Sequence, residues 1–122
     1  MTNDLGKMVV VLNHDDAHSV LASLVMAASI ATSGEQVLFF VQPGGAQMLA
    51  KGELEKYQNQ KGQPDPIHLY ESIRTLDGRF ILCELGLDIC DIKKEDLREG
   101  AEVMMASSFM FEIEGAKLSF SY

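Results

Sequence analysis

The residues with the clearest chemical potential are two cysteines, Cys83 and Cys90, which lie together in the segment ILCELGLDIC. A cysteine thiolate is a nucleophile, whereas a free cysteine in an apolar setting often acts only as a small core side chain. If residues 83–90 formed one helix, the two Cα atoms would be about 10 Å apart. A disulfide tolerates roughly 7 Å at most, so we expect two free thiols. Whether either thiol is reactive is left open by residue type alone.

Position separates the two thiols. Cys83 ends the apolar run RFILC, which is typical of a buried strand, and Cys90 falls about two helical turns later. In open α/β sheets, ligands and reactive groups gather beyond the carboxyl ends of the strands. A helix beginning at Leu85 or Gly86 would direct backbone N–H groups at the Cys83 sulfur and favour the thiolate, although Glu84 and Asp88 would oppose it. We therefore predict that Cys83 is the reactive thiol and that Cys90 is auxiliary or structural.

His14 and His18 are four residues apart in NHDDAH, a spacing that can place two imidazoles on one helical face. Because no third ligand is near them in the sequence, we expect no structural zinc site and name no metal ligands. Asp15 or Asp16 is expected to cap the helix that follows. A functional alternative is that His14 lies beside Cys83 and promotes its thiolate.

A third candidate is the QPGG turn, in which Gln42, Gly44 and Gly45 follow an apolar strand. It resembles an anion-binding turn at a helix start, but it matches neither the P-loop nor the dinucleotide-binding fingerprint. We interpret it as a tight strand-to-helix turn with a weak potential for ligand binding. Met104, Met105 and Met110 are expected in the core or at an interface, since methionine adapts to irregular gaps.

These residues are positioned by an alternation of apolar strands and helical segments. Strands are predicted at residues 7–13, 35–41, 79–83, 101–106 and 116–122, the last as an edge strand. Helices are predicted at residues 17–34, 43–52, 65–78, 85–90 and 107–115, with a polar surface loop at 56–66 and a charged connection at 93–100. The pattern indicates a single α/β domain, residues 1–122, with a mainly parallel five-stranded sheet, helices on both faces and a flavodoxin-like topology.

The predicted helix at residues 17–34 has only serine and threonine as interior polar residues beyond its first turn, and therefore no charged face. Such a helix has to be covered on nearly all sides. In so small a domain, we expect another subunit to provide part of this cover, so the sequence predicts a homo-oligomer.

Composition excludes several classes of partner. With 18 acidic and 10 basic side chains, the net charge of -8 disfavours nucleic acid and anionic membrane surfaces. The longest nearly apolar stretch, residues 20–31, is too short to span a membrane, and the amino-terminal segment does not resemble a signal peptide. We expect a cytoplasmic protein with reduced cysteines.

The order of these landmarks resembles the DsrE/DsrF-like family of sulfur-relay proteins. The resemblance rests on KMVVVLN, AASIATSG, VLFFVQPGGAQMLAKG and above all RFILCELGLDICDIKKEDLREGAEV, and it spans nearly the whole chain. It implies a flavodoxin-like subunit in trimers or hexamers. It also implies that Cys83 carries sulfur as a persulfide or thiosulfonate, passes it to a partner such as a TusA-like carrier, and needs no cofactor.

The family also contains members that lack the active cysteine and serve as structural subunits. The sequence therefore leaves three functions open: a sulfur carrier or sulfurtransferase that uses Cys83, a noncatalytic assembly subunit, and a small-ligand-binding module that uses the turn at residues 42–45.

Overall fold

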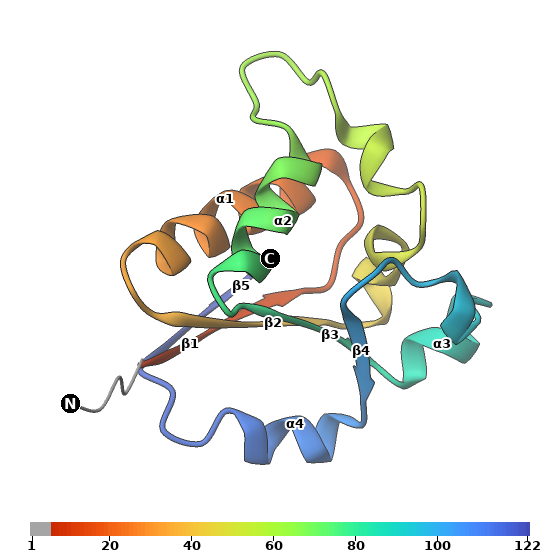
Figure 1. The fold of residues 1–122 in the computed structure, drawn as a ribbon. Coiled ribbons are helices and arrows are strands. Elements are labelled where there is room, and N and C mark those ends of the chain that lie inside the picture. Colours follow the sequence, from red (N-terminus) through yellow and green to blue (C-terminus); the bar gives the residue numbers. More distant parts are fainter. Residues whose placement is uncertain (1–5) are drawn as a thin grey trace.

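The computed structural model describes residues 6–122, so the first five residues, which bear on the export prediction, lie outside it. Its centre is a five-stranded sheet in the order β4-β3-β2-β1-β5 (Figure 1). The strands are β1 (Lys7–Leu12), β2 (Gln36–Val41), β3 (Arg79–Cys83), β4 (Ala101–Met104) and β5 (Leu118–Ser121). All neighbouring strands pair in parallel.

The predicted fold class is confirmed, since an all-parallel sheet with helices on both faces is consistent with a flavodoxin-like α/β fold. The position next to β1 at the edge of the sheet is held by the last strand, β5. In flavodoxin itself, the second strand holds this position.

The α-helices within residues 6–122 are α1 (Ala17–Thr32), α2 (Pro66–Thr75), α3 (Leu85–Ile89) and α4 (Ala106–Glu112). Of the two predicted capping residues, Asp15 and Asp16, it is Asp16 that caps α1, because its side chain accepts a hydrogen bond from the Ser19 N–H. Asp65 caps α2 in the same way through the Ile67 N–H. The described part of the chain also contains three 3₁₀ helices: η1 (Pro43–Leu49), η2 (Leu54–Tyr57) and η3 (Lys94–Asp96).

Three predicted elements differ in form. The helix expected at residues 43–52 is the 3₁₀ helix η1, which ends at Leu49. The loop expected at 56–66 begins inside η2. The helix after Cys83 has only five residues and ends at Ile89, before Cys90.

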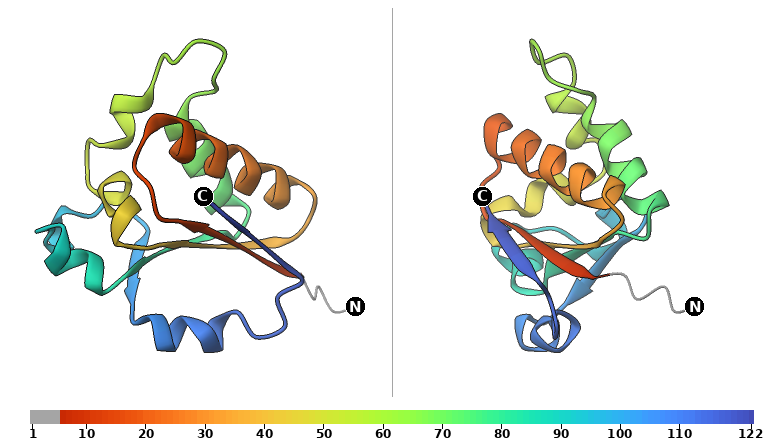
Figure 2. Two further views of the ribbon diagram at one scale, coloured as in Figure 1. Left: turned by 180° about the vertical axis from the view of Figure 1, so that it is seen from behind. Right: turned by 90° about the vertical axis from the view of Figure 1, so that its left-hand side faces the viewer.

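The direction of the crossovers decides which face each helix covers. From β1 to β4 the chain moves steadily across the sheet in one direction, and right-handed connections then place α1 and α2 on the same face. The return from β4 to β5 runs in the opposite direction, so α4 crosses the other face (Figures 1 and 2). We call these the α1/α2 face and the α4 face.

The two faces carry separate apolar cores. The larger core lies under α1 and α2, where Phe80 stacks on Tyr70 with ring centroids 4.2 Å apart and packs at a tilt against Phe39 with centroids 4.8 Å apart. The smaller core lies under α4 and contains six buried residues: Val9, Leu38, Phe40, Ile81, Cys83 and Phe109. One helix of seven residues is thus the main cover of the α4 face.

The α1 helix is covered mostly within its own subunit. Its buried residues face the sheet and α2, and its exposed side is a narrow strip without acidic residues, lysine or arginine: His18, Ala22, Val25, Ser29 and Thr32. Intramolecular packing therefore largely explains why α1 has no charged face, and the homo-oligomer stays a prediction.

Within residues 6–122, the structure contains no helix with the length and apolar character needed to cross a bilayer.

Two phenylalanines of α4 provide a matched test of its role as a cover. Phe109 is 2% exposed and stacks on Phe40 with centroids 4.1 Å apart, whereas Phe111 is 78% exposed. Phe109→Ala is expected to lower the free energy of unfolding by about 3 kcal/mol or more, because it empties the smaller core. Phe111→Ala is expected to change it by less than about 0.5 kcal/mol. Urea unfolding followed by circular dichroism measures both, and equal effects would contradict this description of α4.

Candidate functional site

Cys83 is the last residue of β3 and lies on the α4 face. Its side chain is 5% exposed and belongs to the smaller apolar core. On β4 its register partner is Met104, which is half-buried against the same core. The next residue, Glu84, donates its N–H to the Met104 carbonyl oxygen at 3.0 Å. The thiol therefore lies at the carboxyl edge of the sheet, as predicted, but it is buried.

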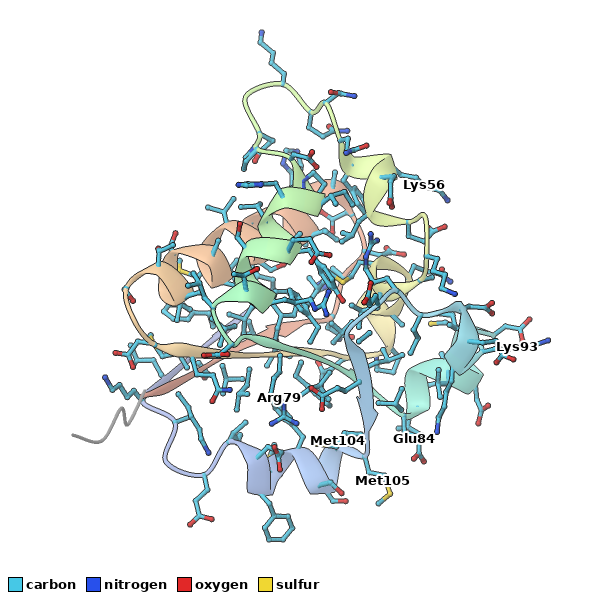
Figure 3. The ribbon with its side chains drawn as sticks, viewed as in Figure 1. Lys56, Arg79, Glu84, Lys93, Met104 and Met105 are labelled. Atoms are coloured by element: carbon cyan, nitrogen blue, oxygen red, sulfur yellow. The ribbon has the colours of Figure 1, made fainter. Side chains whose placement is uncertain are left out.

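Near the thiol, the first turn of α4 contributes no buried side chain. The α4 helix begins directly after Met104 and Met105, and Met105 at the N-cap position forms no side-chain cap. Met105 is 51% exposed and points away from the sheet (Figure 3), and the next three residues are also exposed. Phe109 is the first side chain of α4 that is buried. The first turn of α4 thus borders the Cys83 region with few contacts to the sheet.

The opposite end of α4 is anchored by charge. Arg79 begins β3 and lies between the sheet and α4 (Figure 3), where it donates to Glu102 on β4 at 2.8 and 2.9 Å and to Glu112 on α4. Lys7 adds a hydrogen bond from its Nζ to the Glu112 carbonyl oxygen at 3.0 Å. Hydrogen bonds from Arg79 lower the pKa of Glu102, and those to both glutamates raise the pKa of Arg79. The helix is therefore fixed at its carboxyl end and less constrained at the end near Cys83.

Sequence reasoning missed this anchor. Arg79, Ile81 and Cys83 alternate along β3 and so share one face, and this period of two was readable in RFILC. The contribution of Glu102 and Glu112 required knowledge of which elements pack on that face.

Cys90 occupies a different environment. It is the C-cap residue of α3, is half-buried, and its Sγ donates to the Pro43 carbonyl oxygen at 3.2 Å. It packs against the core of the α1/α2 face, whereas Cys83 belongs to the core of the α4 face. Both thiols are free, as predicted. Cys90 thus helps to hold α3 against η1, a contact so close that a Cβ on Gly86 would lie 3.2 Å from the Ala46 Cβ.

The structure does not bring His14 to Cys83. His14 is exposed in the segment after β1, and β2 separates β1 from β3, so the two strand ends are about 10 Å apart. His18 is exposed on the first turn of α1. Among residues 6–122, no three or more His, Cys, Asp and Glu side chains gather in a group that could hold a metal ion.

The N–H groups of Gly44 and Gly45 in the QPGG turn are already hydrogen-bonded within the protein. Gly44 N–H donates to the Asn13 side-chain oxygen at 3.0 Å, and Gly45 N–H donates to the Gln42 carbonyl oxygen at 2.9 Å. A Cβ on Gly44 would lie 2.1 Å from the Asn13 carbonyl oxygen, so this glycine is explained by close packing against the end of β1. The geometry adds no support for a ligand at this turn.

Comparison with known proteins gives a fold and no closer relationship. No protein-family model matches the chain, and no curated protein sequence matches it. The YchN protein from E. coli superposes with a TM-score of 0.77 at 17% identity, covering 97% of this chain and 100% of that one. A protein of unknown function from Methanobacterium thermoautotrophicum, MTH1491, superposes with a TM-score of 0.71 at 17% identity, covering 96% of this chain and 99% of that one. The chain therefore has a DsrE/YchN-like fold.

The charge anchor of α4 predicts a pH dependence. Because Arg79 depresses the pKa of Glu102, this carboxylate stabilises the folded state above its ordinary pKa of 4.5, and the contribution is lost as the pH falls through the lower folded-state pKa. Glu102→Gln is therefore expected to be less stable than the wild type at neutral pH and to lose less stability on acidification below about pH 4.5.

Urea unfolding between about pH 3 and pH 7 measures this difference. Glu114→Gln is the control, because Glu114 is exposed and forms none of the ion pairs found in residues 6–122. It should retain the wild-type pH profile, and a Glu102→Gln profile parallel to that of the wild type would contradict the role given to Glu102.

Proposed function

We propose that the chain carries sulfane sulfur on Cys83, as a persulfide or thiosulfonate, and passes it to the thiol of a partner protein. The observation that carries this proposal is the place of Cys83, a free thiol that ends β3 at the carboxyl edge of a parallel sheet. The DsrE/YchN-like fold and the sequence resemblance of residues 79–103 to sulfur-relay proteins support it.

The chemistry needs only thiols. The Cys83 thiolate attacks the outer sulfur of a donor persulfide, the donor S–S bond breaks, and the donor leaves as a thiolate while Cys83 becomes Cys–S–SH. With tetrathionate, attack on an inner sulfur releases thiosulfate and leaves a thiosulfonate adduct on Cys83. In the second step an acceptor thiolate attacks the sulfane sulfur, and the Cys83 thiolate is restored. The sulfur moves without net oxidation, so no metal or organic cofactor is needed.

The burial of Cys83 sets a condition on this cycle. An apolar environment would shield a loaded persulfide from thiols in solution, but donor and acceptor have to reach the sulfur. The first turn of α4 is the part of the cover with the fewest anchors, since it has no side-chain cap and its first buried residue is Phe109. Opening of this turn would expose Cys83 while Arg79 and Lys7 still hold the carboxyl end of α4.

The surface around this edge suits a protein acceptor such as a TusA-like carrier. Leu85 and Ile89 of α3 are exposed on successive turns, and Met105 is exposed at the start of α4. Exposed large apolar side chains near a reactive thiol favour a protein partner over a small polar substrate.

A second function is favoured by the same burial. Cys83 is one of six buried residues in the smaller core, and a thiol in that setting can serve simply to fill the core without any chemical role. In that case the chain is a noncatalytic subunit of an assembly.

Two serine substitutions separate these functions. Cys83→Ser is expected to abolish loading by polysulfide, thiosulfate or tetrathionate, because it removes the nucleophile. Cys90→Ser is the matched control and should retain at least part of the loading, since Cys90 lies on the other side of the sheet. Intact mass spectrometry detects the adduct, and peptide mapping should place it on Cys83.

Stability and subunit mass are measured in parallel, so that a folding defect is not mistaken for lost chemistry. If neither cysteine loads with any donor, and Cys83 resists alkylation in the native protein, the assembly-subunit function is the better one.

A further inference from the structure

The free edge of β5 is equipped to pair with another strand. Within the described residues, β5 pairs only with β1 and ends the sheet. Tyr122, just beyond β5, directs both backbone groups to β1, because its N–H donates to the Val11 carbonyl oxygen and its own carbonyl oxygen accepts from the Asn13 N–H. Backbone groups along a parallel strand alternate in direction, so those of Ser119 and Ser121 point away from β1.

This edge lacks the features that normally block pairing. Residues 118–122, LSFSY, contain no charged residue, no proline and no glycine. Charged side chains and proline are the usual means by which edge strands avoid other chains. Two copies with a net charge of -8 repel each other at a distance, so a self-contact has to avoid acidic groups. Residues 115–122 contain none, and Lys117 is paired with Glu35 at 2.9 Å.

The side chains of this segment repeat symmetrically about Phe120. Leu118 pairs with Met8 and Phe120 with Val10, which places both on the α1/α2 face, while Ser119 and Ser121 lie on the α4 face. Leu118 is 58% exposed and the two serines are also exposed. Read in either direction from Phe120, the order is serine and then an apolar residue. An antiparallel pairing centred on Phe120 therefore places serine opposite serine and Leu118 opposite Tyr122.

We propose that a second copy of this chain pairs with the first through β5, antiparallel and about a two-fold axis at Phe120. In this register Ser119 of one copy lies opposite Ser121 of the other, and their outward backbone groups form about four hydrogen bonds. Leu118 lies opposite Tyr122, and the two Phe120 side chains meet at the axis. The two five-stranded sheets then form one continuous sheet.

The strand contact alone is smaller than the roughly 800 Å² per partner of a stable interface. A groove of about 650 Å³ adjoins β5 on the α4 face, lined among others by Met110, Ala116, Lys117 and Ser119. The lining includes Ser119 of β5 and the exposed Met110 of α4, so apolar surface adjoins the strand contact and can add to it. A dimer that dissociates on dilution is expected. A two-fold contact also fits a hexamer built from dimers, but it cannot occur in a closed trimer alone.

Sedimentation-velocity ultracentrifugation over a range of protein concentrations tests the proposal with two charge variants. Ser119→Glu together with Ser121→Glu places like charges opposite each other at both serine positions, and is expected to weaken dimerisation at least tenfold. Ser119→Lys together with Ser121→Glu places Lys opposite Glu at both positions, and is expected to restore the dimer. Both serines are exposed, so circular dichroism and Tm should change little in either variant.

The restored dimer also reports the register, because a shift of the pairing by two residues would place Lys opposite Lys in one direction and Glu opposite Glu in the other. The matched control is Ser107→Glu with Ser108→Glu, two exposed serines on α4 outside β5, which should leave the dimer intact. If the chain forms a larger assembly, the doubly acidic β5 variant should divide it. Any of four results would overturn the proposal. The wild type could be monomeric at all concentrations, or its assembly could be unaffected by the acidic β5 pair. The Lys/Glu variant could dimerise no better than the acidic one, or the control could lose the dimer.

Discussion

The handedness of the crossover connections controls most of what is distinctive about this structure. Because β2, β3 and β4 are added in one direction, α1 and α2 have to share a face, and only the return to β5 places a helix on the other. That helix, α4, has seven residues and one fully buried side chain, Phe109. A large core and a small core are the direct consequence, and the candidate thiol belongs to the small one.

The two cysteines lie in different environments although they are close together in the sequence. They are seven residues apart, yet Cys83 faces α4 while Cys90 donates to Pro43 and packs toward the other core. Gly86 allows this division, because its missing side chain lets α3 lie directly against Leu82 and Ala46. Their environments differ because β3 ends at Cys83 and the chain then turns around α3 to the opposite side.

The ion pairs of α4 and its uncapped start give the helix two unequal ends. Arg79 joins β3, β4 and α4 at one end, so this arginine couples the strand that carries Cys83 to the helix that covers it. At the other end Met105 offers no side-chain cap and stays exposed. Motion of the cover is therefore expected at the end nearest the thiol, which connects the stability of the smaller core to the proposed chemistry.

The sequence by itself determined the fold class, the five strands, an aspartate cap at residue 15 or 16, the two free thiols and the place of Cys83 at a strand end. These follow from local patterns, namely apolar runs, turn residues and capping side chains, which act over a few residues. Only the tertiary structure decided that Cys83 is buried and that His14 lies two strands away from it. It also decided that the N–H groups of the QPGG turn are hydrogen-bonded within the protein, and that Arg79 holds α4. Each of these depends on strand order and on which helix covers which face, and contacts between residues distant in the chain leave no periodic signal in the sequence.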